Sequence, residues 1–348
     1  MSGRVKVVYS PLHARHDGGM EIHRGQFVPT FETPARAEII RTALAAAGHE
    51  LIAPREFPES RLLRIHDAEY VEFLRGAYAR WQAEGRDECM LPSGFPARGL
   101  RQDRKPAGIS GAMGYHCFDS STPIVAGTWD AALAAARSAM TAAALVAGGE
   151  RAAYALCRPP GHHAGRSFYG GYCFLNNAAL AAQYLRDEGC ARVAVVDIDY
   201  HHGNGTQEIF WQRDDVMFVS LHGTPDTEYP YFLGYADERG SGRGEGHTLN
   251  LPMPAGTGWN GYQPALETAL AAVRRFAPDA LVVSLGVDTF AGDPISAFRL
   301  EGAHYPLIGA SLAALGLRTV LVQEGGYAVA EIGDNVAGVL GAFDRSPA

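Results

Sequence analysis

The sequence predicts an α/β protein built on a doubly wound, mostly parallel β-sheet flanked by helices. Short aliphatic runs alternate with long alanine-rich helical segments, which is the pattern of strands and helices that alternate along the chain. The run Val193 to Val196 is continuously apolar, as is typical of a parallel strand covered on both faces. With 348 residues, 47% of them hydrophobic, the chain is long enough for a large core. We expect one catalytic domain over residues 1–348.

The expected elements follow this alternation. We predict strands at Val5 to Tyr9, Ala153 to Cys157, Val193 to Asp197, Val216 to Leu221, Ala280 to Leu285 and Thr319 to Gln323. We predict helices at Pro34 to Ala47, Trp129 to Ala147, Asn176 to Arg186, Tyr262 to Phe276 and Tyr305 to Leu315.

Two segments interrupt the alternation. Arg86 to Pro123 is rich in Gly, Pro, Ser and Arg and is too long for an ordinary connection, which favours a functional or interface loop. Tyr229 to Gly258 contains spaced glycines, but it matches neither a P-loop nor a dinucleotide-binding fingerprint.

Composition excludes several classes of function. A net charge of −8 argues against general nucleic-acid binding and is compatible with a cationic substrate. The five cysteines are odd in number and form no C-x-x-C pair, which indicates reduced thiols. The stretch MSGRVKVVYS enters a strand-like run without the apolar core that is typical of a signal peptide, and no run approaches about 18 apolar residues. We therefore expect a soluble cytoplasmic protein with no membrane or nucleic-acid partner.

Polar residues follow four of the predicted strands at the points where the strands end. AYALC runs into RPPGHH, VAVV into DIDYHH, ALVVSLG into VDTF, and VLVQ into EGGY. The carboxyl ends of the strands are where open α/β sheets build their sites. The sequence therefore predicts one site at this edge of the sheet.

Asp199, His201 and Asp288 are the candidate metal ligands. Two carboxylates and one imidazole leave coordination positions open for water or substrate, as in catalytic zinc sites. Zinc is the default, but the oxygen-rich set also suits Fe(II), Mn(II) or Co(II). Each aspartate taken alone is equally compatible with a helix cap or a buried salt bridge.

Two aspartates largely cancel the charge of such an ion, so other groups must help to activate water and stabilise an oxyanion. His162 and His163 can supply a base, and Tyr327, after Gly325 and Gly326, can supply a hydroxyl donor. The alternatives are a polar turn after Pro-Pro-Gly for the histidines and a packed loop aromatic for the tyrosine.

These motifs together resemble the histone deacetylase superfamily on the arginase-deacetylase fold. The stretches RPPGHHA, GGYCFLNNAA, VDIDYHHGNGTQ, SLHG, SLGVDTFAGDP and EGGY occur in the family's order and spacing over nearly the whole chain. GTWDAA and YPYFLGYADE are most similar to the bacterial acetylpolyamine amidohydrolases. The resemblance implies a zinc-dependent hydrolase that removes acetyl groups from acetylated amines, with acetylpolyamines as the expected substrates.

The resemblance also implies roles for the tandem histidines. It makes Asp199, His201 and Asp288 the zinc ligands, Asp197 the partner of His162, and Asn204 the partner of His163. An anionic partner favours imidazolium at His162, whereas a neutral amide leaves His163 closer to neutral. We therefore expect His163 to be the general base and His162 to give electrostatic support.

Further roles rest on the resemblance alone. Tyr327 matches the tyrosine that polarises the substrate carbonyl, Tyr172 and Gly171 match a wall of the substrate tunnel, and Arg36 matches an arginine near an acetate exit channel. A structural K⁺ site is implied at Asp197, Asp199, His201, Ser220 and Leu221.

The segment at about residues 86–123 resembles an insertion through which polyamine-type members form a homodimer that narrows the entrance. In that insertion Ser110 and Ser121 stand where a studied type of enzyme has acidic residues for the polyamine. Asp17, Glu21, Asp103 or Asp119 are possible substitutes. The alternative substrates are acyl-lysine in proteins or another small acylated amine.

Two other classes of protein compete with this interpretation. A dinuclear ureohydrolase of the arginase type needs further carboxylates where this chain has Gly203 and Gly286. A non-enzymatic acetyl-binding module would lack a ligand, the base or the tyrosine, whereas this chain keeps all of them.

Overall fold

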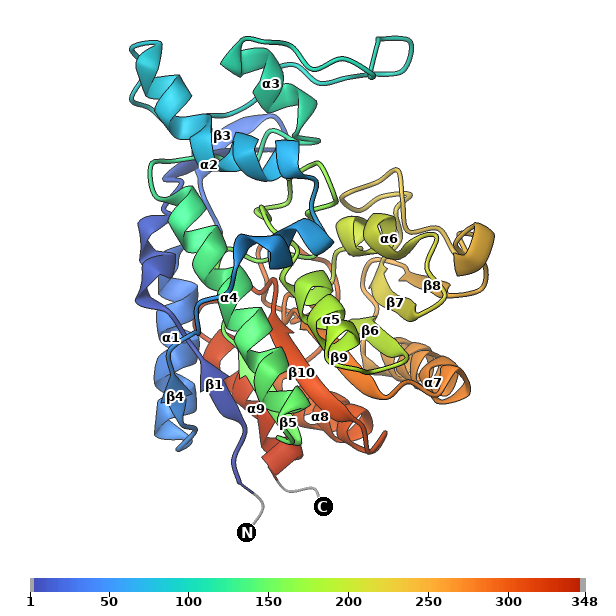
Figure 1. Ribbon diagram of the computed structural model, residues 1–348. Coiled ribbons are helices and arrows are strands. Elements are labelled where there is room, and N and C mark those ends of the chain that lie inside the picture. Colours follow the sequence, from blue (N-terminus) through green and yellow to red (C-terminus); the bar gives the residue numbers. More distant parts are fainter. Residues whose placement is uncertain (1–2, 345–348) are drawn as a thin grey trace.

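An eight-stranded sheet forms the centre of the molecule, in the order β4-β1-β5-β10-β9-β6-β7-β8 (Figure 1). The structure is a computed structural model that describes residues 3–344. Every neighbouring pair of strands in this sheet is parallel. Its strands are β1 (Lys6–Val8), β4 (Leu51–Ile52), β5 (Ala152–Ala155), β6 (Val193–Asp197), β7 (Val216–Gly223), β8 (Thr248–Met253), β9 (Ala280–Leu285) and β10 (Arg318–Gln323).

Helices cover both faces of the sheet. They are α1 (Pro34–Ala46), α2 (Ala68–Ala83), α3 (Ile109–Tyr115), α4 (Thr128–Ala147), α5 (Asn177–Asp187), α6 (Asn204–Phe210), α7 (Trp259–Phe276), α8 (Tyr305–Ala313) and α9 (Ile332–Asp344). Among the described residues, 3₁₀ turns occur at Pro11–Arg15, Glu59–Arg64, Gly242–Gly244 and Gly302–His304. A separate antiparallel hairpin pairs β2 (Met20–His23) with β3 (Gln26–Pro29).

The predicted parallel α/β sheet is confirmed by the strand pairing. Alternate residues of strand β6 pack into two different cores, one on each face of the sheet. Val193 and Val195 of β6 pack in a core with α2, α3, α4, α5 and α6. Ala194 and Val196 pack in a second core with α1, α7, α8 and α9. Both faces of the strand therefore exclude water, which explains why its sequence does not alternate.

Two of the expected irregular segments contain regular structure. Tyr229 to Gly258 includes the edge strand β8, whose sequence TLNLPM lies against β7, and Arg86 to Pro123 includes the short helix α3. The elements α2, α6, α9, β4 and the β2–β3 hairpin were not predicted from the sequence. The short elements among these carry too few residues to show a period.

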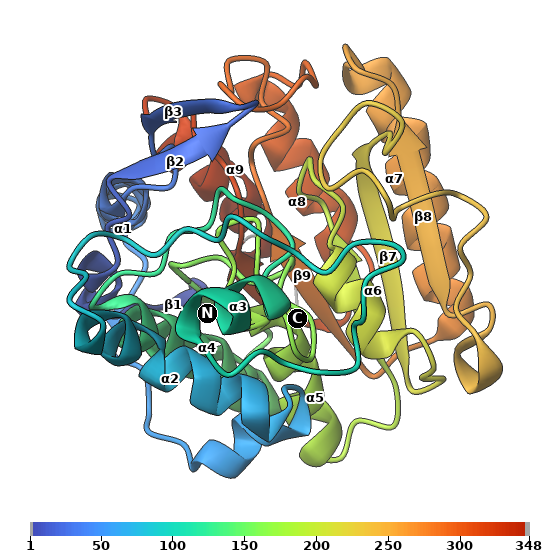
Figure 2. The ribbon, with the colours of Figure 1, turned by 90° about the horizontal axis from the view of Figure 1, so that it is seen from above.

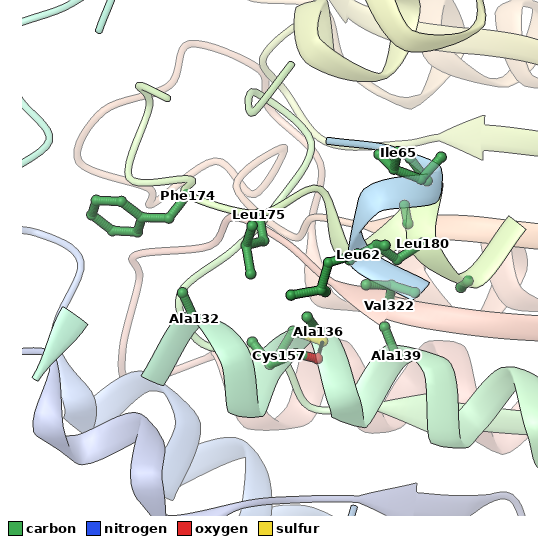
Figure 3. Packing of buried hydrophobic residues seen from close by; sticks show 14 of the residues in the cluster. Leu62, Ile65, Ala132, Ala136, Ala139, Cys157, Phe174, Leu175, Leu180 and Val322 are labelled. Atoms are coloured by element: carbon green, nitrogen blue, oxygen red, sulfur yellow. Dashed lines mark hydrogen bonds between the residues drawn. The ribbon is translucent and has the colours of Figure 1, made fainter. Parts of the chain in front are cut away.

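Helix α4 corrects the expectation that no segment resembles a membrane span. By length and composition alone, the helix is long and apolar enough to cross a membrane. However, 67% of its most apolar 18-residue window is buried inside the fold. Its alanines Ala132, Ala136 and Ala139 face a core that includes Cys157 and Val322 (Figure 3). The small side chains let the helix approach the sheet closely, so α4 is a core helix.

The hairpin β2–β3, α2 and α3 gather at the end of the molecule opposite to the two ends of the chain (Figure 1). Seen from above, the segment that contains α3 crosses in front of the sheet (Figure 2). The strands end below these segments, and the predicted site lies between the two. All five cysteines are free.

Candidate metal centre and active site

The predicted site residues meet where β5, β6, β9 and β10 end. Asp199 and His201 follow β6, Asp288 follows β9, and these two strands are neighbours in the sheet. Both aspartates are fully buried, and His201 is 8% exposed. The chain therefore brings two carboxylates and an imidazole together in an interior that is costly for unpaired charge.

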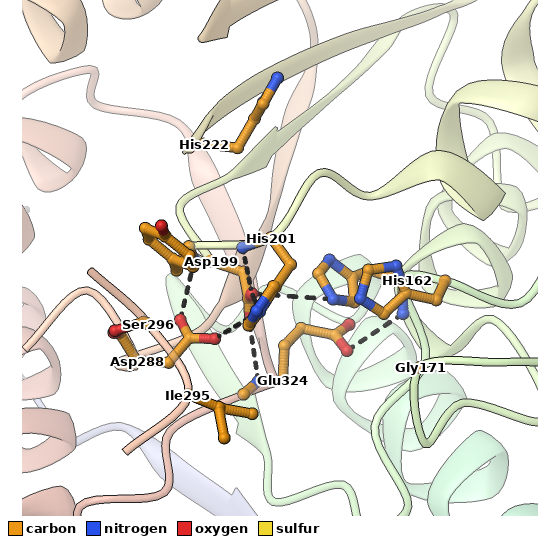
Figure 4. A network of polar contacts seen from close by, with 12 residues as sticks. His162, Gly171, Asp199, His201, His222, Asp288, Ile295, Ser296 and Glu324 are labelled. Carbon is orange, nitrogen blue, oxygen red and sulfur yellow. Dashed lines mark hydrogen bonds and ion pairs between the residues drawn. The ribbon is translucent and has the colours of Figure 1, made fainter. Parts of the chain in front are cut away.

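The three side chains fit a divalent metal ion. One ligand atom from each lies within 4.8 Å of the other two. His201 Nδ1 is 3.0 Å from Asp288 Oδ2 and 3.4 Å from Asp199 Oδ1 (Figure 4). Glycine is required beside them, since a Cβ at Gly286 would lie 2.1 Å from Asp199 Oδ2. The Gly325 amide donates to the same oxygen at 2.7 Å and fixes its direction.

The electrostatics of the aspartates also favour a cation. Burial, together with the charge of Asp199, raises the pKa of Asp288 to about 7. Burial acts in the same direction on Asp199, but the charge of His162 and the contact with His201 hold the pKa of Asp199 below its usual value. Two buried carboxylates at this distance repel each other unless a positive charge lies between them.

A second group of possible ligands, His162, Cys173 and Glu324, lies nearby. Two of its members already make hydrogen bonds within the protein. Glu324 Oε2 accepts the amides of Gly161 and His162, at 2.6 and 3.1 Å, and Cys173 Sγ donates to the Gly171 carbonyl. Glu324 therefore holds the histidine loop, and Asp199, His201 and Asp288 remain the candidate metal ligands.

The tandem histidines lie in two different electrostatic environments. His162 Nδ1 is 2.9 Å from Asp197 Oδ2, and His163 Nδ1 donates to Asn204 Oδ1 at 2.6 Å. Burial lowers the pKa of His162, but the Asp197 and Asp199 carboxylates outweigh it and raise that pKa to about 10. Burial and the neighbouring His162 charge lower the pKa of His163 well below its usual value. Neutral His163 therefore has Nε2 left to accept a proton.

Tyr327 is held on its loop from several sides. Its amide donates to Asp293 Oδ2 at 2.7 Å, and its ring lies under the Arg36 guanidinium at 4.6 Å. Arg36 is buried and donates to the carbonyls of Glu324 and Gly326, at 2.7 and 2.5 Å. Arg36 thus braces the loop that presents the tyrosine, and its place near an acetate channel stays a prediction.

One cavity of about 470 Å³ connects these groups to the surface. Among the residues predicted for catalysis and the tunnel, its lining includes His162, His163, Gly171, Tyr172, His201 and Tyr327. A Cβ at Gly171 would lie 2.2 Å from the His163 ring, so only glycine lets the tunnel wall approach the base this closely.

The residues considered for recognition of the polyamine charge lie in different places, and only some of them line the cavity. Ser121 and Asp119 line the cavity, whereas Ser110 is an exposed residue of α3 and its hydroxyl accepts from Arg86. Glu21 is buried and accepts the Tyr172 hydroxyl at 2.7 Å, and Asp103 pairs with Arg101 at the surface. Asp17 is exposed outside the cavity lining.

The residues of the implied K⁺ site lie around the end of β6 and the adjoining part of β7, where Asp197 is paired in register with Ser220. Asp197, Asp199 and Ser220 are fully buried, and Leu221 follows in β7. This proximity is what a cation site between two strand ends requires, and the occupancy of the site by K⁺ stays a prediction.

Two glycines bear on the ureohydrolase alternative. A Cβ at Gly203 would lie 2.3 Å from Asp197 Oδ2, and one at Gly286 would lie 2.1 Å from Asp199 Oδ2. Carboxylate side chains cannot occupy these positions without displacing the aspartates already there. The geometry therefore favours one transition metal over a dinuclear centre.

Sequence reasoning missed several residues that support the site. Glu32 is buried between Arg36 and Arg158, with nitrogen-to-oxygen distances of 2.7 and 2.8 Å. Glu324 stands in the EGGY motif, yet its contacts with the histidine loop join residues 162 positions apart. No local period or spacing marks such long-range partners, although a glutamate directly after a buried strand could have signalled one.

Comparisons with known proteins agree with this geometry. Residues 30–343 match the histone deacetylase domain family. The chain is 51% identical over 339 residues to "Acetylpolyamine amidohydrolase 1" of Pseudomonas aeruginosa, covering 97% of this chain and 98% of the relative. It is 47% identical to "Acetylpolyamine amidohydrolase" of Mycoplana ramosa, with 97% and 98% covered.

A solved structure gives the same result in three dimensions. The crystal structure of acetylpolyamine aminohydrolase from Burkholderia pseudomallei superposes with a TM-score of 0.93 at 40% identity, and it covers 98% of this chain and 99% of that one. Sequence and fold therefore agree over nearly the whole length. The chain belongs to the histone deacetylase domain family.

Proposed function

We propose that this protein is a zinc-dependent amidohydrolase that removes acetyl groups from acetylated amines, with acetylpolyamines as its substrate class. The observation that carries the proposal is the shared cavity of His163, His201 and Tyr327, because a base, a metal ligand and a hydroxyl donor there face one small volume. The names of the similar bacterial enzymes support the choice of acetylpolyamine. The products are acetate and the free amine.

Asp199, His201 and Asp288 would hold a divalent ion, which would supply Lewis-acid polarisation and a lower pKa for a water molecule. His163 Nε2 takes the proton from water as its oxygen attacks the carbonyl carbon. The Tyr327 hydroxyl donates to the oxyanion that forms. His163 then gives its proton to the amine nitrogen as the C–N bond breaks, and the positive charge of His162 stabilises the negative charge developed nearby.

The metal and the monovalent ion can be proposed from the donor atoms. Zinc suits one imidazole and two carboxylates, and Fe(II), Mn(II) and Co(II) suit the same oxygen-rich set. We also propose a structural K⁺ at the ends of β6 and β7. Elemental analysis of protein purified without added metal, together with reactivation after chelation, identifies the ion that the protein prefers.

We further propose that residues 1–348 form one catalytic domain that acts in the cytoplasm as a homodimer. The segment of residues 86–123 contributes Phe95, Phe118, Asp119, Ser120 and Ser121 to the cavity lining, so contact between two copies through it would narrow the entrance. The five free cysteines suit a reducing compartment. Sedimentation at micromolar concentration tests the dimer, and a species of monomer mass alone would contradict it.

Substrate choice is tested by the ratio of kcat/KM for N-acetylputrescine to kcat/KM for an acetyl-lysine peptide, measured by acetate release with zinc-loaded protein. We expect a ratio well above one. The observation that favours the competing activity on acyl-lysine is Ser121, because this cavity-lining residue carries no negative charge to attract a polyamine. A ratio near or below one would favour that activity, and no release from either would contradict the proposed function.

A further inference from the structure

Two carboxylates line the cavity beyond the metal-ligand and catalytic groups, and they have very different hydrogen-bonding environments. They are Asp119, from the segment of residues 86–123, and Glu228, from the loop after β7. An acetylated diamine carries an ammonium at the end away from the amide. Whichever carboxylate has free acceptor capacity is the natural partner for that ammonium.

Asp119 is fully used by the protein. Its Oδ2 accepts the Gly171 amide at 2.6 Å, the Tyr229 hydroxyl at 2.7 Å and the Thr122 hydroxyl at 3.3 Å. Its Oδ1 accepts the Ser121 amide at 3.2 Å and the Cys117 thiol at 3.8 Å. A carboxylate has about four lone-pair sites, so Asp119 is committed to joining three segments of the wall.

Glu228 is less engaged and well positioned. Its side chain accepts the Thr227 hydroxyl at 3.0 Å and lies beside the Tyr200 hydroxyl. Its backbone is fixed on both sides, because its amide donates to the Thr224 carbonyl at 3.0 Å and its carbonyl accepts the Tyr231 amide at 3.0 Å. The carboxylate is half-buried in the cavity lining and keeps lone pairs for a ligand.

The neighbour of Glu228 links it to the catalytic groups. The Tyr229 ring centroid is 5.2 Å from that of His163 and 6.0 Å from that of His201. Tyr229 also stacks on Phe118 at 6.0 Å, so two aromatic rings line the cavity that His163 and Glu228 share. Such faces suit both the methylene chain of an alkylamine and a passing cation. The exposed Arg24 at the tip of the β2–β3 hairpin is the arginine of the lining that opposes this charge.

We propose that Glu228 is the specificity-determining residue that binds the free ammonium of an acetylated diamine while its amide lies at the metal centre. The inference rests on the proposed function and deepens it, because it assigns the charge recognition that Ser110 and Ser121 do not supply. Glu228 selects the substrate by charge, and the aromatic walls select it by width.

The test compares N-acetylputrescine with N-pentylacetamide, a neutral molecule of nearly the same shape, in wild type and in Glu228→Gln. We expect the ratio of kcat/KM for the charged substrate to kcat/KM for the neutral one to fall by about tenfold to a hundredfold in the variant, since a charge-assisted bond is lost. Asp226→Asn is the matched control, because Asp226 is an exposed acid of the same loop outside the cavity lining. It should keep the wild-type ratio.

A second variant guards against a folding defect. In Glu228→Arg, activity on 4-acetamidobutyrate, whose far end is a carboxylate, should rise relative to N-acetylputrescine, and far-UV circular dichroism should match the wild type. Equal losses on the charged and neutral substrates in Glu228→Gln, or an unchanged ratio, would overturn the role of Glu228 while leaving the hydrolase intact. Failure of wild type to release acetate from either molecule would instead overturn the proposed function, and the inference with it.

Discussion

At the scale of single residues, the tandem histidines show how neighbours divide two identical side chains into two roles. His162 faces the Asp197 carboxylate, and His163 faces the Asn204 amide. The first imidazole therefore holds its proton, with a pKa of about 10, and the second gives up its proton readily. A charged group and a neutral base lie with ring centroids 4.0 Å apart, and each environment strengthens the difference.

Replacing the neutral partner should shift the pH dependence of catalysis. In Asn204→Asp an anion faces His163 and favours its protonated form, so its pKa rises. Because the neutral base is the active form, the acid limb of the kcat/KM profile should move to higher pH by about one unit or more. Metal content measured on the same sample serves as the control, and an unmoved acid limb at full metal occupancy would refute His163 as the base.

The hydroxyl of Tyr327 can be tested by removing one atom. Tyr327→Phe should lower kcat by roughly 10²- to 10³-fold, since an oxyanion donor is lost while the ring keeps its packing under Arg36. The matched control is Tyr78→Phe, which deletes a surface hydroxyl that donates to the Asp87 carbonyl. Comparable kcat in the two variants would show that Tyr327 is only a packed aromatic.

At the scale of elements, the strands with continuous aliphatic runs were predictable, whereas the long helices α2 and α9 and several short elements were not. Strands β6 and β9 were predicted with their observed limits, because continuous aliphatic runs are a strong signal of buried parallel strands. Helix α6 begins at Asn204, inside the functional motif, where glycine and polar residues hide a helix of seven residues. The same residues therefore belong both to the functional motif and to the first turn of a helix.

Replacing two helical glycines by alanine should change the free energy of unfolding in opposite directions, because their surroundings differ. A Cβ at Gly309 of α8 would lie 2.4 Å from the Val339 carbonyl oxygen of α9, whereas one at Gly76 of α2 would meet no atom within 4 Å. Gly309→Ala should therefore lower the free energy of unfolding by about 1–3 kcal/mol. Gly76→Ala should raise it by about 0.5–1 kcal/mol, since alanine favours helix. Denaturant unfolding measures both, and equal effects would contradict the packing of α8 on α9.

The entrance wall depends on one side chain that joins separate elements. Asp119→Ala leaves the Gly171 amide and the Tyr229 hydroxyl without their acceptor, so we expect a loss of about 1–3 kcal/mol in the free energy of unfolding. The control Asp226→Asn changes the same charge on an exposed loop and should have little effect. Thermal unfolding of the two variants measures the difference, and matching midpoints would show that Asp119 is dispensable.

At the scale of the whole molecule, the sheet explains why the site was predictable from four short motifs. Parallel strands bring their carboxyl ends to one edge, so the motifs alone predict that Asp199, His201 and Asp288 lie close together. The sequence did not reveal Glu32 and Arg158, or the contacts of Asp119, because these pairs join distant segments without a repeating pattern. Strand order gathers the catalytic groups, and the connecting segments complete the cavity.

The central claim is that Asp199, His201 and Asp288 hold the metal on which amide hydrolysis depends. The most direct measurement determines bound metal and acetate release from N-acetylputrescine on the same preparations of wild type and Asp288→Ala. We predict about one equivalent of divalent metal with acetate release in wild type, and loss of both in the folded variant. Stoichiometric metal with full activity in Asp288→Ala would contradict the site described for this protein.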